Sequence, residues 1–233
     1  PAPVAAVPIW MTETQPVAYL DGKDTAGSKG GTVTNDVISN ITLVNGDNSV
    51  NNNFGELKSA SIGDRVWYDC NVNGLQDSGE VGVSGVTVKL YTAGANGTFG
   101  DADDVLVATK TTDASGNYLF NNLSAGSYQV LFDKTTLPAG YGLTKKDVGS
   151  NDAIDSDASL TTGRSQTVIL AAGTQNLTVD AGLHKVGIDV QKYVSSTQCV
   201  TVNNCAGEGA SVSYWKGNCT WVSSLNSYGW SGT

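Results

Sequence analysis

The chain has 233 residues and a formal net charge of −9, which argues against a protein that binds the phosphate backbone of nucleic acids, because such proteins need a basic face. It contains one histidine, His184, so a metal site built on several histidines is excluded, and no apolar run approaches the roughly 18 residues that a membrane-spanning helix needs. Glycine accounts for 28 residues, and Thr, Val, Asn and Ser are also frequent, a composition typical of short strands joined by tight turns.

Residues 1–59 repeat the second half of the unit that follows them. Residues 41–46 (ITLVNG) resemble residues 168–173 (VILAAG), and a second glycine follows nine residues later in each copy. Self-similarity of this kind is typical of tandem modules. The sequence therefore predicts that residues 1–59 are the C-terminal part of a module. Its predicted strands lie at residues 4–14, 38–43 and 50–57.

Residues 60–185 form a complete unit that is predicted to be all-β. Residues 86–91 (VTVKLY) alternate between apolar and polar side chains, which is the period-two pattern of a half-buried strand. The other predicted strands lie at residues 62–68, 105–112, 117–120, 127–132, 167–170 and 177–183. Short strands at this spacing predict an immunoglobulin-like β-sandwich.

The segment at residues 69–80 (DCNVNGLQDSGE), directly after the first predicted strand of this unit, matches the twelve-residue calcium loop of EF-hand proteins. Short oxygen-bearing side chains at alternating positions converge on one cation, and Gly74 permits the sharp turn. The predicted ligands are the side chains of Asp69, Asn71, Asn73, Asp77 and Glu80 and the carbonyl of Leu75. Because strands rather than helices flank the segment, we expect an EF-hand-like loop on a β scaffold. The competing interpretation is a solvated hairpin rich in Asn, Asp and Gly.

Two further acidic clusters lie in loops of the same unit. The first consists of Asp101, Asp103 and Asp104, and the second of Asp152, Asp155 and Asp157. Carboxylates crowded this closely repel one another unless a cation neutralises them. Ligand sets made only of oxygen select a hard cation, and the mixture of carboxylate, amide and carbonyl suits Ca²⁺ better than Mg²⁺. We therefore expect calcium at both clusters; the alternative is that the charges only keep these loops soluble.

Five segments of the complete unit carry a family resemblance. They are residues 63–69 (GDRVWYD), 71–77 (NVNGLQD), 82–88 (GVSGVTV), 112–118 (TDASGNY) and 155–157 (DSD). Together they resemble the SdrD B-like repeat, a family of calcium-binding, Cna B-like sandwich modules of bacterial surface proteins. The resemblance covers residues 61–184 fully and residues 9–57 as a partial copy. It implies tandem Cna B-like modules in an extracellular protein of the bacterial cell surface, with neighbouring modules of the same protein as partners.

Residues 186–233 differ in composition from the rest of the chain. They hold three of the five tryptophans (Trp215, Trp221, Trp230) and three of the four cysteines. A segment this short does not fold alone without disulfides, a structural metal or a partner. It is therefore predicted to be a partial β domain or an assembly segment that begins with a strand at residues 188–194. In an extracellular setting we expect a disulfide between Cys199 and Cys205; the alternative is two free thiols.

Two classes of function are compatible with the sequence. The first is a non-catalytic structural or adhesive surface protein, a calcium-stiffened repeat of an adhesin, filament or surface array. The two partial modules, residues 1–59 and 186–233, are completed either by a longer parent chain or by strand complementation between copies. In strand complementation, residues 188–194 of one copy enter residues 1–59 of the next copy, head to tail.

The second class is an accessory carbohydrate-binding region of a secreted enzyme, in which the tryptophans of the tail stack on the sugar rings of a glycan or host ligand. Catalysis by this chain itself is not expected. Paired carboxylates serve glycosidases, but every acidic cluster here lies in a loop that calcium already explains.

Overall fold

The computed structural model describes residues 7–187. The predicted strand at residues 188–194, the predicted Cys199–Cys205 disulfide and the tryptophans of the tail lie outside the described residues. The same holds for nearly all of the predicted partial domain at residues 186–233. Within residues 7–187 there is no α-helix, and no helix is long and apolar enough to cross a bilayer.

The chain divides into two compact units. The first comprises the chain up to Ile62 together with Phe120–Ser127 and Val168–Asn176; the second comprises Gly63–Leu119, Tyr128–Thr167 and the chain from Leu177 onwards. The predicted domain boundary after residue 59 stays a prediction.

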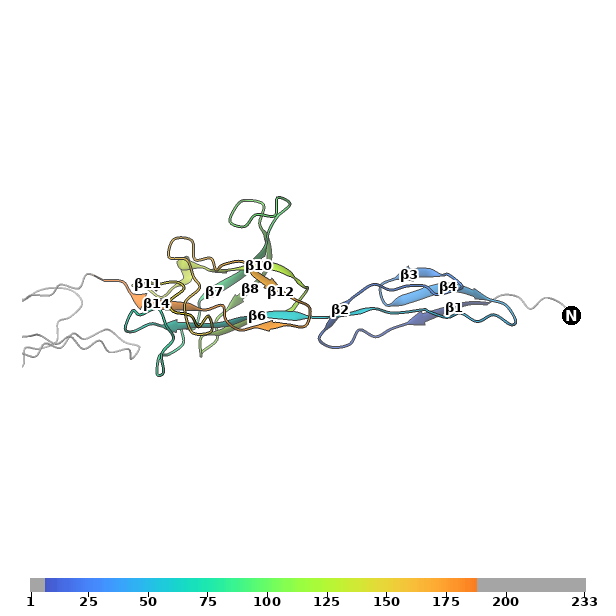
Figure 1. The fold of residues 1–233 in the computed structure, drawn as a ribbon, viewed down its shortest axis with the longest axis horizontal. Coiled ribbons are helices and arrows are strands. Elements are labelled where there is room, and N and C mark those ends of the chain that lie inside the picture. The colour runs from blue at the N-terminus through green and yellow to red at the C-terminus, as the bar shows by residue number, and fades with distance from the viewer. Residues whose placement is uncertain (1–6, 188–233) are drawn as a thin grey trace, which may run out of the picture. The chain divides into compact units, whose positions relative to one another are not determined.

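The N-terminal part of the first unit contains two small antiparallel sheets (Figure 1). One has the strand order β1-β4-β3, built from β1 (Val7–Thr12), β4 (Val37–Leu43) and β3 (Thr32–Thr34), and the other pairs β2 (Tyr19–Asp21) with β5 (Glu56–Lys58). Ile38 and Ile41 are buried, so β4 supplies the apolar centre of its sheet. A two-residue turn joins β3 to β4, and Asp36 in this turn has a φ of 58°, the left-handed conformation that tight hairpins require.

The remaining strands form two larger sheets, which make up the predicted β-sandwich. One sheet has the order β12-β10-β7-β8; the other has the order β11-β14-β6-β13, with β9 also paired to β6. Strands β13 and β14 run parallel to β6, whereas β11 and β14 are antiparallel. The bounds are β6 Ala60–Tyr68, β7 Thr87–Thr92, β8 Val105–Thr111, β9 Asn117–Leu123, β10 Gly126–Phe132, β11 Tyr141–Leu143, β12 Val168–Leu170, β13 Gln175–Asn176 and β14 Ala181–Lys185, with a short 3-10 helix at Lys134–Thr136.

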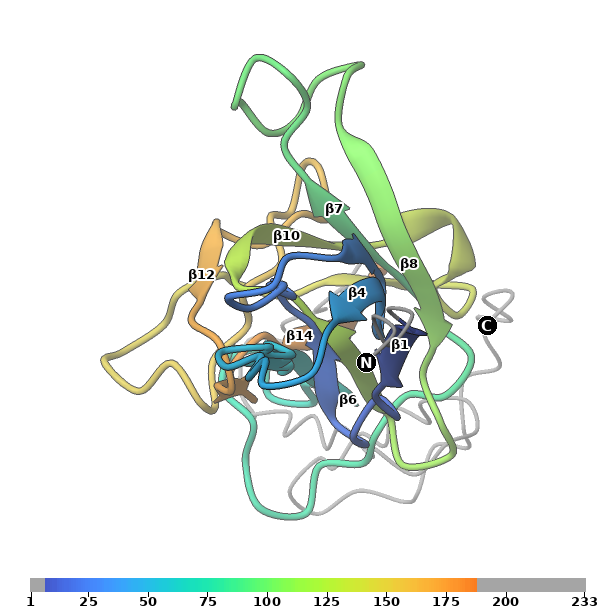
Figure 2. The same cartoon turned by 90° about the vertical axis from the view of Figure 1, so that its right-hand side faces the viewer.

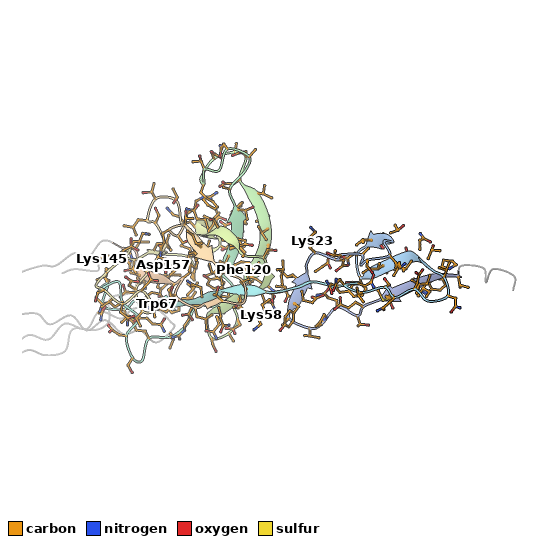
Figure 3. All side chains as sticks on the ribbon, turned by 45° about the vertical axis from the view of Figure 1, so that its right-hand side comes forward. Lys23, Lys58, Trp67, Phe120, Lys145 and Asp157 are labelled. Atoms are coloured by element: carbon orange, nitrogen blue, oxygen red, sulfur yellow. The ribbon has the colours of Figure 1, made fainter. Side chains whose placement is uncertain are left out.

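The hydrophobic core of the second unit follows from alternation along its strands. In β7, Val88 and Leu90 are fully buried, while the other residues of the strand are half-buried. Phe132 of β10 is fully buried too, and its ring meets that of Tyr118 edge to face, with centroids 5.7 Å apart. Trp67 and Asp157 are both 0% exposed, and Figure 3 shows their side chains inside this unit. The long connection between β7 and β8 projects away from the sheet (Figure 2).

Two predicted strands are partly wrong. Residues 177–180 lie outside the strands, which are β13 and β14 in this region, because the Asp180 N–H donates to the Asp157 carboxylate at 2.6 Å instead of to a neighbouring strand. Residues 50–55 are also irregular, and only Glu56–Lys58 forms a strand. Asn51 there has a φ of 62°, which no regular strand accommodates.

Candidate metal centre

Asp69 is the first residue of the predicted calcium loop, and hydrogen bonds fix both its backbone and its carboxylate. It follows the last residue of β6, is 1% exposed, and its N–H donates to the carbonyl of Leu183 in β14 at 2.8 Å. Its Oδ2 accepts from the N–H of Gly74 at 2.8 Å and from the hydroxyl of Thr144, and its Oδ1 accepts from the N–H of Asn73 at 3.2 Å. The first ligand position of the loop is therefore anchored to two other segments of the second unit.

The middle of the loop turns its polar side chains toward one another. Asp77 Oδ2 accepts from the side-chain amides of both Asn71 and Asn73, each at 2.8 Å. The Oδ1 atoms of the two asparagines accept from backbone N–H groups within the loop, at 3.0 Å and 2.7 Å. The side chains predicted as ligands at positions 3, 5 and 9 thus meet directly.

Glu80, the last residue of the loop, binds backbone N–H groups of the loop through its carboxylate. Its Oε1 accepts from the N–H of Cys70 and its Oε2 from the N–H of Asp77, both at 2.9 Å. Burial raises the pKa of the Glu80 carboxyl, and the nearby charges of Asp69 and Asp77 raise it further. The structure therefore places Glu80 beside the other predicted ligands, although it joins them through N–H groups rather than through a shared side-chain contact.

The predicted calcium loop packs against the segment that carries the acidic cluster at residues 152–157. Leu75 forms a bridge with Asp155, the N–H of Gln76 donates to Ile154 at 2.6 Å, and the N–H of Ser156 donates to the Gly74 carbonyl at 3.2 Å. Two candidate ion sites that are far apart in sequence therefore share a backbone ladder.

The cluster at residues 152–157 is a compact set of carboxylates. Oxygen atoms of Asp152, Asp155 and Asp157 all lie within 4.8 Å of one another. Asp155 is 5% exposed, and its Oδ1 is shielded from solvent without a hydrogen-bond donor. Burial raises the pKa of Asp157 to about 7 and also raises that of Asp155, to which the charges of Asp152 and Asp147 contribute. Among the described residues, no lysine or arginine forms an ion pair with these three carboxylates, although the charge of Lys146, which pairs with Asp147, acts to lower the pKa of Asp155. The donor set fits a hard cation.

Asp180 belongs to the same acidic region. It is fully buried, its Oδ1 accepts from the N–H of Arg65 at 3.1 Å, and its Oδ2 has no donor. Burial, followed by the negative charge of Asp64, raises the pKa of Asp180 to about 9. Sequence reasoning missed Asp64, because a single aspartate inside a strand carries no signal that it faces another carboxyl group.

The cluster at residues 101–104 differs, because a protein cation already neutralises part of it. Arg164 pairs with Asp104 at 2.8 Å and lies over the ring of Tyr91, 4.8 Å from its centroid. Asp101 and Asp103 instead gather around Asn96, whose side-chain amide donates to Asp101 at 2.8 Å and whose backbone N–H donates to Asp103 at 3.2 Å. The structure thus brings Asp101 and Asp103 together and gives Asp104 a separate partner.

Comparison with known proteins gives one family and several relatives. The family model described as the SdrD B-like domain matches residues 60–183. Serine-aspartate repeat-containing protein F of Staphylococcus epidermidis is 35% identical over 170 residues, which cover 73% of this chain and 9% of that protein. Serine-aspartate repeat-containing protein D of Staphylococcus aureus strain Newman is 38% identical over 149 residues, 64% of this chain and 10% of that protein. The chain thus spans about a tenth of the length of these relatives.

Among solved structures, the minor pilin GBS52 of Streptococcus agalactiae has a TM-score of 0.35 and 15% identity, over 66% of this chain and 61% of the pilin. The shaft pilin SpaA of Lactobacillus rhamnosus has a TM-score of 0.34 and 12% identity, over 56% of this chain and 52% of the pilin.

Proposed function

Because the chain belongs to the SdrD B-like domain family, we propose that it is a non-catalytic, calcium-stiffened spacer in an extracellular protein of the bacterial cell surface. The observation that carries this proposal is the pair of adjoining acidic sites. Residues 69–80 and residues 152–157 share a backbone ladder, and the second site holds a buried carboxylate oxygen, Asp155 Oδ1, with no donor.

The residues around these sites connect parts of the module that are distant in sequence. Asp69 fixes the end of β6 to β14 through the Leu183 carbonyl, and Asp157 holds the residue before β14 through the N–H of Asp180. Bound calcium supplies the positive charge that these carboxylates lack. The module then resists local opening at this end, which is the mechanical property that a spacer needs.

Thermal unfolding of the full chain tests the calcium part of the proposal. Extracellular calcium modules bind at roughly 10⁻⁴–10⁻³ M, and a hundredfold excess over the dissociation constant stabilises the folded state by about 2.7 kcal/mol. The chain should melt higher in calcium than in chelator, and Glu80→Gln should remove much of this increment, because it takes away one charge and a bidentate ligand.

The matched control is Asp133→Asn. Asp133 pairs with Lys89 at 2.8 Å and belongs to none of the acidic clusters, so this variant should lower the melting temperature and leave the calcium-dependent increment intact. A melting temperature that does not change across a calcium titration of the unmodified chain would contradict the proposal.

The same proposal includes head-to-tail assembly by strand complementation. Within the described residues, β1 is an edge strand of its sheet, and it exposes Val7 (64%), Ile9 (41%) and Trp10 (67%). An edge of this kind is a template for an added strand, and residues 188–194 of the next copy supply that strand.

Electron microscopy of the purified chain, with a deletion of residues 188–233 as the control, tests assembly. Filaments that the deletion abolishes are expected. A monodisperse monomer at high concentration, unaffected by the deletion, leaves completion of the ends to a longer parent chain.

A further inference from the structure

Cys70, the second residue of the predicted calcium loop, is in a disulfide bond. The chain contains three other cysteines, Cys199, Cys205 and Cys219, and all of them follow the last described residue, Gly187. The partner of Cys70 within this chain is therefore one of the cysteines of residues 188–233. The sequence predicted a disulfide inside that segment, but none that joins it to the sandwich.

Strand pairing brings the exit of the described chain to the end of the sandwich where Cys70 lies. β14 runs parallel to β6, with Leu183 paired to Tyr68, and the N–H of Asp69 donates to the Leu183 carbonyl at 2.8 Å. Neighbouring strands lie roughly 4.8 Å apart. Residues 188–233 therefore begin shortly after a strand that lies directly beside the end of β6, which Cys70 follows.

Cys70 is held in a fixed position on the sandwich. Its N–H donates to Glu80 Oε1 at 2.9 Å, and its Sγ atom lies 3.4 Å from the carbonyl oxygen of Tyr68. The residue before it, Asp69, is 1% exposed. Because the loop already orders this sulfur atom, the conformational entropy lost on forming the bond falls mainly on the C-terminal segment.

An aromatic surface lies beside the point where the chain leaves the sandwich. The ring centroids of Tyr68 and Tyr141 are 4.8 Å apart, and both residues are half-buried. Tyr141 pairs with Lys185 between β11 and β14, and the next residue, Val186, is 51% exposed. A C-terminal segment bonded to Cys70 is therefore held next to apolar surface that its three tryptophans are suited to cover.

Loop length decides which of the three cysteines bonds to Cys70. Cys199 already lies twelve residues beyond Gly187, and an extended chain spans up to about 3.6 Å per residue, so each of the three can reach the end of β6. Cys199 and Cys205 are six residues apart, and a short loop costs less entropy to close than a long one. These two therefore pair with each other, which leaves Cys219 for Cys70.

We propose that Cys70 and Cys219 form an intrachain disulfide that ties the C-terminal segment to the end of β6, beside the predicted calcium loop. The inference rests on the extracellular setting of the proposed function, where such bonds persist. The two thiols together lose two protons and two electrons, and a small extracellular disulfide that accepts them is reduced to two thiols. Tension on the chain beyond Cys219 then reaches the sandwich at Cys70 and bypasses residues 188–218.

Tryptic mapping of the full chain without reduction tests the pairing. Free thiols are first blocked with N-ethylmaleimide in denaturant at slightly acidic pH. Trypsin then places Cys70 in residues 66–89, Cys199 and Cys205 together in residues 193–216, and Cys219 alone in residues 217–233. We expect residues 66–89 and 217–233 to stay linked until they are reduced. A blocked Cys70, or a link from residues 66–89 to residues 193–216, overturns the proposal.

Two variants give matched controls for the same map. Cys219→Ser should leave Cys70 open to N-ethylmaleimide, whereas the double variant Cys199→Ser/Cys205→Ser should leave Cys70 protected. Equal labelling of Cys70 in the two variants contradicts the pairing. Electrophoresis without reduction should show a monomer, and multimers that collapse on reduction would place the bond between copies and overturn the intrachain assignment.

The calcium part of the proposed function is tested separately from this disulfide. Cys219→Ser removes none of the predicted calcium ligands, so its melting temperature should still rise in calcium. A calcium response without the disulfide overturns the pairing alone, and the disulfide without a calcium response overturns the calcium-stiffened spacer alone.

Discussion

The acidic loops of the second unit obtain their counter-charge from different sources. At residues 101–104, Arg164 pairs with the nearly buried Asp104. At residues 152–157, three carboxylates crowd together and Asp155 keeps a shielded oxygen without a donor. Asp104 thus has a cationic partner in the folded protein, although its Oδ1 is also buried without a donor, whereas none of the three carboxylates at residues 152–157 forms an ion pair with a described lysine or arginine. We therefore expect calcium to stabilise residues 152–157 more strongly than residues 101–104.

The pH dependence of unfolding in chelator should show the largest effect. The pKa values of Asp157 and Asp180 are raised to about 7 and about 9, from an ordinary 3.8. The folded state therefore binds more protons than the unfolded state between these values, so the stabilising contribution is complete below pH 4 and is lost as the pH rises through 7 to 9. The decline has a slope of roughly 1.4 kcal/mol per pH unit for each proton released.

Calcium should flatten this decline, because a bound cation favours the ionised carboxylates. Denaturant melts at pH 5 and pH 8, with calcium and with chelator, measure the effect. Stability in chelator that rises from pH 5 to pH 8 would mean that these carboxyl groups are not held in their protonated form.

Removing the positive charge of Arg164 should make the loop at residues 101–104 respond to calcium as we expect residues 152–157 to do. Arg164→Gln leaves Asp104, whose side chain is 2% exposed, without its partner, and loss of one member of a buried pair costs about 3 kcal/mol. Calcium should recover part of this loss, because Asp101, Asp103 and Asp104 then lack positive charge. Arg164→Lys, which keeps the charge, is the control. Chemical denaturation with and without calcium measures both, and the comparison fails if calcium has no larger effect on Arg164→Gln than on Arg164→Lys.

Two glycine-to-alanine variants in the predicted calcium loop should have a smaller effect on stability, and their difference separates the cost of backbone conformation from the cost of packing. Gly74 and Gly79 both have positive φ values, 86° and 94°. A Cβ at Gly74 would lie 2.7 Å from Val148 Cγ2 and 2.9 Å from the Lys145 carbonyl oxygen, whereas a Cβ at Gly79 would meet nothing within 4 Å. Both alanine variants carry the left-handed penalty, and Gly74→Ala adds a clash, so it should be less stable than Gly79→Ala by about 2 kcal/mol.

Calorimetric melting of the two variants in calcium measures that difference. Equal melting temperatures would show that the loop is not packed on residues 145–148 as described.

The alternation of apolar and polar residues was sufficient to predict strands whose backbone pairing with neighbouring strands is not interrupted by a side chain. Residues 86–91 were predicted as a strand from alternation, and Val88 and Leu90 are indeed the buried members of β7. Residues 177–183 were also predicted as a strand, but only their last three residues belong to β14. Hydrophobic alternation records which side chains face a core, and it does not record that a carboxylate such as Asp157 takes the N–H of Asp180 away from the ladder.

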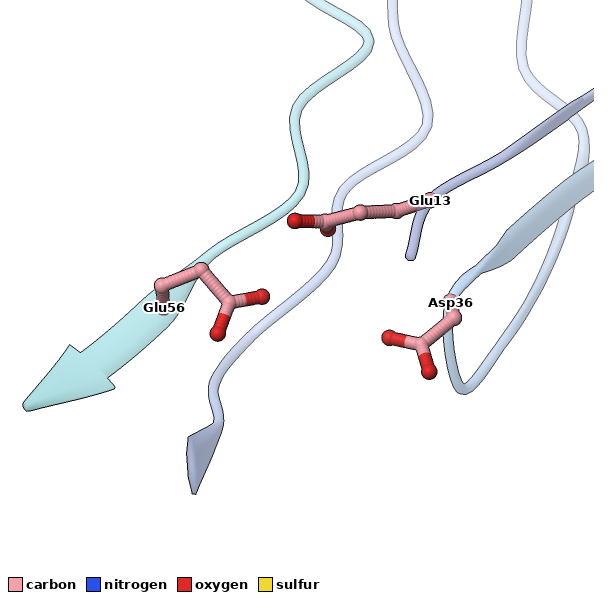
Figure 4. Close-up of side chains that lie close together, drawn as sticks. All are labelled: Glu13, Asp36 and Glu56. Atoms are coloured by element: carbon pink, nitrogen blue, oxygen red, sulfur yellow. The ribbon is translucent and has the colours of Figure 1, made fainter. Parts of the chain in front are cut away.

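The sequence by itself determined the family and the β-sandwich, and it predicts a calcium loop at residues 69–80, because the expected ligands alternate within twelve consecutive residues and their spacing is a local property of the chain. Only the tertiary structure decided that Asp64 faces Asp180, that Arg164 pairs with Asp104, and that Glu13, Asp36 and Glu56 lie close together (Figure 4). The members of these groups lie on different strands and turns. Their distance is fixed by strand pairing and burial, which no spacing along the chain expresses.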